Sequence, residues 1–289
     1  MKQVFIKKGF SKRSLEIINL AESICNKYAK DGYDLSLRQL YYQFISQNYF
    51  ENSEANYKRL GKIISDARLA GLLDWDFIKD RGRSVIENPH WASPAEIINV
   101  AAKSYRRDLW EDQGYFVMVM CEKQALEGVL WPVCRELDVS FISNKGYSSS
   151  STMYDIAQNR LKDALGEPHV FYLGDHDPSG IDMTRDVEDR LCLLSDRRVY
   201  VHRLALNMDQ IEEYNPPENP TKLTDTRANE YIKMFGESSW ELDALEPTVL
   251  ADLVSDAILE YRDQKIYEKN LELQTNEREK LFKIAKTVK

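Results

Sequence analysis

The chain has 289 residues and a formal net charge of −8 at pH 7, with the apolar content of an ordinary globular protein. No apolar run approaches the roughly 18 residues that a membrane-spanning helix requires, and the N-terminus lacks the apolar stretch of a secretory signal peptide. The four cysteines do not pair at the spacing of metal ligands, so they indicate reduced thiols rather than a structural zinc site. Composition therefore predicts a cytoplasmic protein with no membrane partner.

The net negative charge argues against a nucleic-acid partner, but the charge is unevenly distributed along the chain. Residues 205–263 carry 14 Asp or Glu and 4 Lys or Arg, and we interpret this acidic segment as a solvated surface rather than a shield or a mimic of DNA. Residues 1–84 carry 15 Lys or Arg and 10 Asp or Glu. The N-terminal part could therefore bind nucleic acid, although random variation of surface charge would give the same distribution.

The N-terminal part has the pattern of three helices. Apolar residues recur at helical spacing over residues 13–30, a second helix is expected after a cap at Ser36, and a third over residues 53–69. A turn-rich segment follows over residues 71–88, which makes a first domain of residues 1–90. Three helices and a short hairpin are the parts of a winged helix, and a plain helical bundle packed on the next domain is the alternative. Basic side chains on the outer faces of the third helix are candidates for DNA contact: Lys58, Arg59, Lys62 and Arg68.

The second domain, residues 91–289, alternates between strand and helix patterns. A capped helix is expected from Ser93 to about Trp110. Four apolar runs of strand length follow, separated by helical patterns, at residues 115–121, 139–143, 169–173 and 199–206. Strands that alternate with helices indicate a mainly parallel sheet covered on both faces. The predicted fold class is therefore α/β, with a helical tail from about residue 247.

Three acidic residues follow two of these strands. Glu122 comes directly after the first strand, and Asp175 and Asp177 come just after the third. The carboxyl ends of parallel strands meet at one edge of a sheet, so these carboxylates are expected to converge. Like charges repel, so such a cluster needs a cation, and hard oxygen ligands select Mg²⁺, with Mn²⁺ possible. The alternative is a surface glutamate and an aspartate that caps the next helix, and His176 is assigned no role.

Three motifs resemble those of a known family. Residues 121–126, Cys-Glu-Lys-Gln-Ala-Leu, resemble the first motif of the Toprim domain, and residues 144–147, Asn-Lys-Gly-Tyr, are similar to its glycine turn. Residues 174–182, Gly-Asp-His-Asp-Pro-Ser-Gly-Ile-Asp, resemble its Asp-x-Asp-Pro-x-Gly motif. Over residues 115–185 the chain resembles the family of the DNA topoisomerase VI A subunit and the meiotic double-strand-break transesterase.

This resemblance implies a site and a set of partners. Glu122, Asp175 and Asp177 would bind magnesium, with Glu122 also taking part in catalysis, and Lys145 in the glycine turn is a further candidate for DNA contact. The chain is shorter than is expected for a topoisomerase A subunit and contains no glycine-rich nucleotide-binding box. Strand passage would therefore need a separate ATPase subunit, whereas cleavage alone would not.

A second shared element lies in the N-terminal domain. Arg38-Gln39-Leu40-Tyr41-Tyr42 is similar to the family's Arg-x-x-Tyr-Tyr, in which a winged-helix tyrosine attacks the DNA backbone. On a helix, Tyr41 lies on the apolar stripe, and Tyr42 lies about 100° around, on the face of Arg38. Arg38 could hold the scissile phosphate and favour the phenolate, so we assign the nucleophile to Tyr42 and core packing to Tyr41. The alternative is that both are ordinary helix aromatics.

In the family, the tyrosine of one subunit meets the metal of the other, which implies a homodimer if the two domains are extended. The leading hypothesis is a magnesium-dependent, DNA-cleaving transesterase. One alternative is a Toprim nuclease in which a metal-activated water attacks DNA or RNA. The other is a nucleic-acid-binding module that does not cleave and whose affinity comes from phosphate contacts.

Overall fold

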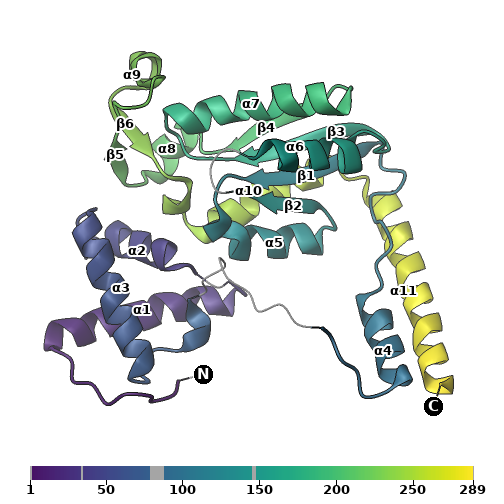
Figure 1. The fold of residues 1–289 in the computed structure, drawn as a ribbon, viewed down its shortest axis with the longest axis horizontal. Coiled ribbons are helices and arrows are strands. Elements are labelled where there is room, and N and C mark those ends of the chain that lie inside the picture. Colours follow the sequence, from purple (N-terminus) through teal and green to yellow (C-terminus); the bar gives the residue numbers. More distant parts are fainter. Residues whose placement is uncertain (1, 34, 79–87, 145–147, 289) are drawn as a thin grey trace.

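The computed structural model describes residues 2–33, 35–78, 88–144 and 148–288 (Figure 1). Its centre is a parallel sheet of four strands in the order β2-β1-β3-β4. The strands are β1 (Tyr115–Cys121), β2 (Ser140–Ser143), β3 (Glu167–Leu173) and β4 (Tyr200–Ala205). The α/β class and the parallel sheet expected from the alternating pattern are confirmed.

Helices cover both faces of this sheet (Figure 1). One face carries η2 (Gln124–Leu126), α5 (Glu127–Glu136) and α10 (Pro247–Glu260), and the other carries α6 (Ser150–Ile156), the π-helical turn η3 (Ala157–Leu161) and α7 (Pro178–Ser195). Alternate residues of β1 enter the two cores, Val119 on the α5 side and Met118 and Met120 on the α7 side. Because both faces are buried, β1 is a continuous apolar run rather than an alternating one.

The chain leaves the sheet after β4 and forms a small region at its edge. This region contains α8 (Met208–Tyr214), β5 (Glu218–Pro220), α9 (Ala228–Phe235), β6 (Ser238–Trp240) and η4 (Leu242–Ala244). β5 and β6 pair as an antiparallel hairpin, and Leu242 is fully buried in the core on the α10 side. These elements lie within the acidic segment of residues 205–263.

The N-terminal helices form their own core. They are α1 (Lys12–Lys30), α2 (Leu37–Ser46) and α3 (Glu54–Leu69), followed by η1 (Trp75–Phe77). Serine side chains cap all three helices, and Ser36 forms a capping box with Gln39 at the start of α2. The fully buried Tyr28, Leu40 and Leu60 bring the three helices together. The three predicted helices are therefore confirmed, while residues 79–87 of the segment expected to form the hairpin lie outside the described residues.

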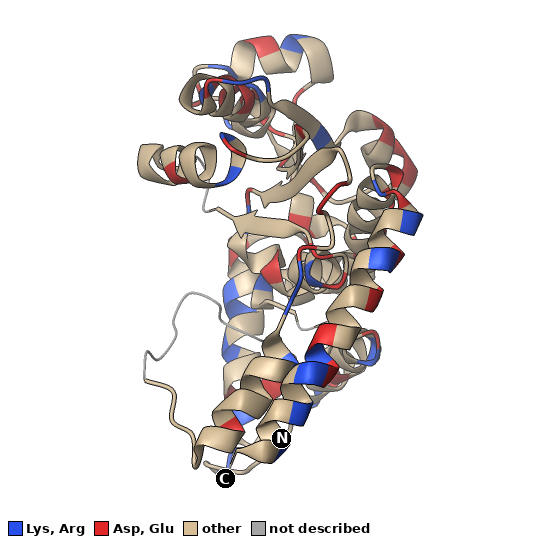
Figure 2. Ribbon diagram, turned by 90° about the vertical axis from the view of Figure 1, so that its right-hand side faces the viewer, with Lys and Arg blue, Asp and Glu red and all other residues tan. Residues whose placement is uncertain are grey.

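An arm of two helices, α4 (Pro94–Ser104) and α11 (Gln264–Thr287), extends away from the sheet (Figure 1). The prediction that the first of these helices reaches Trp110 is wrong. Arg107 N–H donates to Gln274 Oε1 at 2.9 Å, and Leu109 N–H donates to the carboxylate of Asp138 at 3.0 Å, so side chains replace the helical acceptors. Figure 2 shows basic and acidic residues interspersed along the helix that ends at C. In the part of the chain that the structure describes, no helix is both long and apolar enough to cross a bilayer.

The N-terminal helices dock against the acidic segment. The Tyr28 hydroxyl donates to the carboxylate of Glu246, and Asn52 Nδ2 donates to Asn219 Oδ1 at 2.7 Å. The Asp243 side chain, in the same segment, has no exposed surface. The interpretation of this segment as simply a solvated surface is therefore wrong for the residues that face α1 and α2.

Candidate metal and nucleic-acid site

Glu122 and Asp175 lie side by side at the carboxyl ends of β1 and β3. The parallel register pairs Cys121 with Leu173, and Glu122 N–H donates to the Leu173 carbonyl at 2.8 Å. Asp175 N–H in turn donates to Glu122 Oε2 at 3.0 Å. Gly174 permits this approach, because a Cβ at that position would lie 2.8 Å from Glu122 Oε2. The structure therefore brings together two of the three predicted acids.

The surroundings of Glu122 favour either a proton or a cation. The residue is 8% exposed, and burial, followed by the negative charge of Asp175, raises the pKa of Glu122 to about 7. Asp177 adds a smaller contribution in the same direction, while the Asp175 N–H and Lys123 oppose it. Burial also raises the pKa of Asp175, against the opposing charge of Lys123. Negative charge is thus in excess at the strand ends, which is the environment that a divalent cation relieves.

Asp177 belongs to the helix that follows it. Its Oδ1 accepts from Gly180 N–H at 2.6 Å and from the Ser179 hydroxyl at 2.9 Å, so it is the N-cap of α7, with Pro178 at the first helical position. The capping role considered as the alternative is therefore present. Its other oxygen, Oδ2, accepts no hydrogen bond from the described residues.

The three acids do not form a closed metal cage. Across the described ranges, which omit residues 34, 79–87 and 145–147, no group of three or more His, Cys, Asp or Glu side chains is arranged to hold a metal ion. Mg²⁺ needs only one or two protein carboxylates, because water and phosphate oxygens complete its shell. Glu122 Oε1 and Asp175 Oδ2 accept no hydrogen bond from the described chain. The donor set therefore fits a magnesium ion shared with a phosphate better than one enclosed by protein.

Lys123 and Arg203 are the cations beside these acids. Lys123 stands in the first motif, but no role was assigned to it from the sequence. Its Nζ lies 2.8 Å from Asp175 Oδ1, 2.9 Å from Glu241 Oε2 and 2.8 Å from Asp243 Oδ1. Burial acts to lower the pKa of Lys123, but these carboxylates raise it well above its ordinary value. The position of Lys123 next to Glu122 in the sequence could have indicated a cation at the site. Its partners Glu241 and Asp243 lie 118 and 120 residues further along the chain, and no sequence pattern pointed to them.

Arg38 joins the same network from α2. Its guanidinium group forms an ion pair with Glu241, and its Nε lies 3.3 Å from Asp243 Oδ2, without hydrogen-bond geometry. The buried Asp243 side chain therefore bridges the largely buried Lys123 and the partly exposed Arg38. Because Lys123 also contacts Asp175, a continuous chain of ion pairs runs from α2 to the strand ends within one chain. Arg38 is thus linked to Asp175 through Lys123 and the carboxylates of Glu241 and Asp243.

Tyr42 lies beside Arg38 but is buried. It is 3% exposed, and the central guanidinium carbon of Arg38 lies 5.8 Å from the centre of its ring. Burial, followed by the charges of Glu241 and Asp243, raises the pKa of Tyr42, and Arg38 lowers it by less. The expected stabilisation of the phenolate by Arg38 is therefore outweighed in this conformation. Tyr41 packs in the core of the N-terminal helices, as predicted.

His176 anchors the turn that carries the acids. His176 N–H donates to the Trp240 carbonyl at 2.9 Å, Trp240 N–H donates to the His176 carbonyl at 3.0 Å, and the ring Nδ1 lies 2.7 Å from the Tyr231 hydroxyl. The turn after β3 is thereby fixed to β6 and α9. In the same region, Leu242 N–H donates to Asp175 Oδ1 at 2.7 Å. A residue to which the sequence assigned no role thus helps to position Asp175.

Three of the residues proposed for DNA contact lie on the accessible side of α3. Lys58 and Lys62 are exposed and Arg59 is partly exposed, and Lys58 Nζ lies 2.6 Å from Glu54 one helical turn earlier. An exposed pair of this kind is weak, so it leaves Lys58 available to a phosphate. Lys145 and the glycine turn that contains it lie outside the described residues.

Arg68, the fourth candidate on α3, forms structural contacts within the N-terminal domain instead. It donates to the carbonyls of Trp75 and Ile78, and its guanidinium carbon lies 4.8 Å from the centre of the Trp75 ring. These contacts hold the segment after α3 against the helix. DNA contact by Arg68 would require this anchor to be given up.

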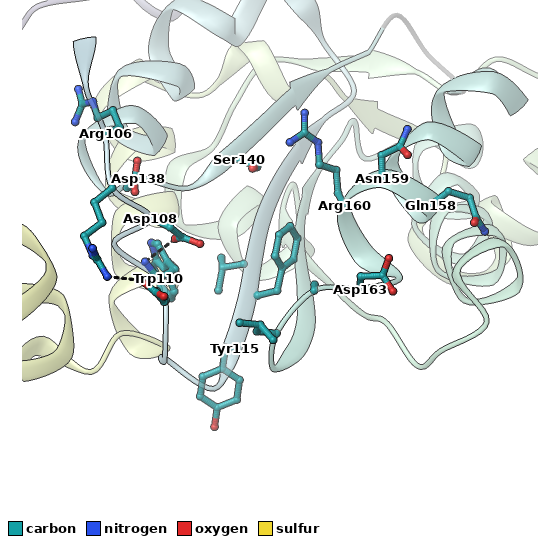
Figure 3. A pocket seen from close by; sticks show the side chains of 16 residues that line it. Arg106, Asp108, Trp110, Tyr115, Asp138, Ser140, Gln158, Asn159, Arg160 and Asp163 are labelled. Carbon is teal, nitrogen blue, oxygen red and sulfur yellow. Dashed lines mark hydrogen bonds and ion pairs between the residues drawn. The ribbon is translucent and has the colours of Figure 1, made fainter. Parts of the chain in front are cut away.

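A separate cavity lies at the other end of the strands (Figure 3). It has a volume of about 540 Å³ and is lined by residues 115–117, which begin β1, whereas Glu122 follows the end of that strand. Figure 3 shows Arg106 and Asp138 on one side and Arg160 and Asp163 on the other. This cavity is separate from the predicted acids, and its mixed charge indicates no single class of ligand.

No protein-family model matches the chain, and no curated protein is similar to it at a significant level. Function must therefore be inferred from the side chains around Glu122 and Asp175.

Proposed function

We propose that the chain cleaves the phosphodiester backbone of nucleic acid in a magnesium-dependent reaction, through a winged-helix domain joined to a Toprim-type domain. The observation that carries the proposal is the pairing of Glu122 with Asp175 at the ends of adjacent parallel strands, with negative charge in excess. The helix that begins at Pro178 follows in the order that the family resemblance implies. Glu122 and Asp175 would hold the ion, with Asp177 beside them.

The N-terminal helices have features that support the winged-helix part of the proposal. An isolated parallel bridge joins Leu35, just before α2, to Ile78, after η1. The chain on either side of the α2–α3 pair is thus brought together, as in a winged helix, where strands flank the helix-turn-helix. In such a domain α3 would enter the major groove, and Lys58 and Lys62 on its exposed side would contact phosphates.

Different side chains of the site would have different roles in the reaction. A magnesium ion at Glu122 and Asp175 would stabilise the charge that develops on the phosphate. Arg38 would bind a non-bridging phosphate oxygen, because a guanidinium group matches phosphate geometry. In the transesterase form, Tyr42 Oη loses its proton and bonds to phosphorus, while the bond from phosphorus to the leaving deoxyribose oxygen breaks and that oxygen takes up a proton. Tyr42 would first have to become accessible.

The burial of Tyr42 favours a second candidate, a Toprim nuclease in which water attacks the phosphorus. A tyrosine that is 3% exposed and has a raised pKa is a poor nucleophile until the structure around it opens. Water needs no such rearrangement, and RNA as well as DNA would then be a substrate. Competition between labelled RNA and DNA in one reaction distinguishes these substrates.

Nicking of supercoiled plasmid in Mg²⁺ or in EDTA tests the proposal. Glu122→Gln keeps the shape of the side chain and removes its charge, and we expect cleavage to fall by about 100-fold or more, the scale of lost charge stabilisation at a reacting centre. Glu136→Gln, at an exposed position of α5, is the matched control and should cleave like the parent. Undiminished cleavage by Glu122→Gln, or by the parent in EDTA, would contradict the proposal.

Tyr42→Phe distinguishes the two nucleophiles. A denaturing gel of labelled DNA shows whether protein stays attached to the cut ends. If the tyrosine attacks, the parent and Tyr154→Phe, a control at a position 57% exposed, form this adduct, and Tyr42→Phe forms neither adduct nor cut. Magnesium-dependent cutting by Tyr42→Phe, without an adduct in any variant, supports water. Binding without magnesium and no cutting with any metal would indicate the non-cleaving module.

A further inference from the structure

Two cations at this site share a single carboxylate oxygen. Lys123 Nζ lies 2.9 Å from Glu241 Oε2, and the Arg38 guanidinium group contacts the same atom. The two cations come from parts of the fold that are remote in sequence, α2 and the turn after β1. Carboxylate and phosphate are the two anions that arginine binds most readily. The bridging oxygen of Glu241 therefore lies where a phosphate oxygen would be bound.

Glu241 and Asp243, the two acids that contact both cations, differ in how easily they could move away. The Asp243 side chain has no exposed surface and touches both Lys123 and Arg38, and Leu242 beside it is fully buried in the core. The Glu241 side chain, in contrast, retains 25% of its surface. Asp243 is thus fixed by the packing of the backbone, while Glu241 can turn away without exposing the core.

Space for an incoming group adjoins Glu241. A cavity of about 210 Å³ is lined by Glu241, Arg38 and Tyr42, together with Asn52 and Asn219. The lining includes donors that suit a phosphate, and also the carboxylates of Glu54 and Glu241. The candidate nucleophile and the first cation therefore both face the space into which a nucleic-acid backbone could enter.

We propose that Arg38 and Lys123 form a binding site for a backbone phosphate of nucleic acid, and that Glu241 occupies this site as an internal competitor when nucleic acid is absent. Asp243 holds both cations in place in either state. This inference rests on the proposed function, because a nucleic-acid substrate supplies the phosphate.

The exchange replaces one anion by another. No cation is left unpaired when Glu241 turns out, so the cost of an isolated buried charge is avoided. Burial opposes ionisation of Glu241, but Lys123 and Arg38 lower its pKa to about 2, so it competes as a full charge at any working pH. Nucleic acid must therefore displace it by its own phosphate charge.

Binding of a short fluorescein-labelled DNA oligonucleotide in EDTA tests the proposal without cleavage. Glu241→Gln should bind about tenfold more tightly than the parent, the scale of one charge-assisted hydrogen bond. For Glu241→Gln, the slope of log affinity against log salt concentration should become steeper by the amount expected for about one additional phosphate contact. Glu237→Gln, an exposed position four residues earlier, makes the same change in net charge and should leave the affinity unchanged. Adding Lys123→Gln or Arg38→Gln to Glu241→Gln should abolish the gain.

Glu241→Ala, which removes the whole carboxylate-bearing arm, is the second variant and should show at least the same gain. Tightening by Glu237→Gln equal to that by Glu241→Gln, or no tightening by either Glu241 variant in its folded form, would overturn the proposal. Magnesium-dependent nicking by the parent together with unchanged oligonucleotide binding by the Glu241 variants would overturn this inference alone. Tightening without nicking in any metal would support the phosphate site and overturn the cleavage.

Discussion

Asp243→Asn removes the carboxylate that joins α2 to the strand ends. The buried Asp243 contacts the largely buried Lys123 at 2.8 Å and the partly exposed Arg38 at 3.3 Å. Removing one partner of a buried ion pair costs about 3–5 kcal/mol when the other partner is left unpaired. Here Lys123 keeps Asp175 and Glu241, and Arg38 keeps Glu241. We therefore expect a loss at the lower end, about 3 kcal/mol of unfolding free energy.

Thermal unfolding followed by circular dichroism measures this loss. For a chain of 289 residues, an unfolding entropy of about 2 cal/mol/K per residue converts about 3 kcal/mol into about 5 °C of melting temperature. Asp256→Asn, at an exposed position of α10, is the control and should stay within about 0.5 kcal/mol of the parent. A shift for Asp243→Asn no larger than that of the control would refute the idea that Asp243 secures the two cations.

Two further predictions concern the turn after β3 and the other end of the strands. Gly180→Ala would place a Cβ 2.2 Å from the backbone oxygen of Asp175, so the turn must shift. Both the melting temperature and magnesium-dependent nicking should therefore fall. Gly9→Ala, where a Cβ meets nothing within 4 Å, is the control and should change neither. Burial lowers the pKa of His169 and His202 in the folded protein. Below their ordinary pKa of about 6.5, the unfolded chain therefore binds more protons than the folded one, and stability declines as pH falls. Replacing both histidines by Gln should flatten the melting temperature between about pH 7.5 and about pH 5.5, and an unchanged slope would contradict this assignment.

The sheet and the placement of its acids could be predicted because they follow from local pattern. Both faces of β1 and β3 are buried, so each strand is a continuous apolar run that the sequence displays directly. Glu122 and Asp175 follow those runs, and parallel strands bring such positions to one edge. The capping of α7 by Asp177 was also visible, although only as the alternative to metal binding.

The ion-pair network could not be predicted, because it depends on how α2 docks against the segment after β6. Lys123 meets Glu241 and Asp243 across 118 and 120 residues, and periodicity carries no information at that range. The same limit applies to Arg68, whose acceptors are carbonyls in η1 and just after it rather than a pattern of side chains. Helical spacing correctly grouped Arg38 with Tyr42 on one helix, but it could not show that both are partly or wholly covered.

Binding of Mn²⁺, followed by electron paramagnetic resonance in the presence of a DNA oligonucleotide, tests most directly whether the strand-end carboxylates hold a divalent ion. The parent and Glu136→Gln should bind the ion equally. Glu122→Gln and Asp175→Asn should each weaken binding by at least about tenfold. Mn²⁺ binding by the double variant with the same affinity as the parent would contradict the account.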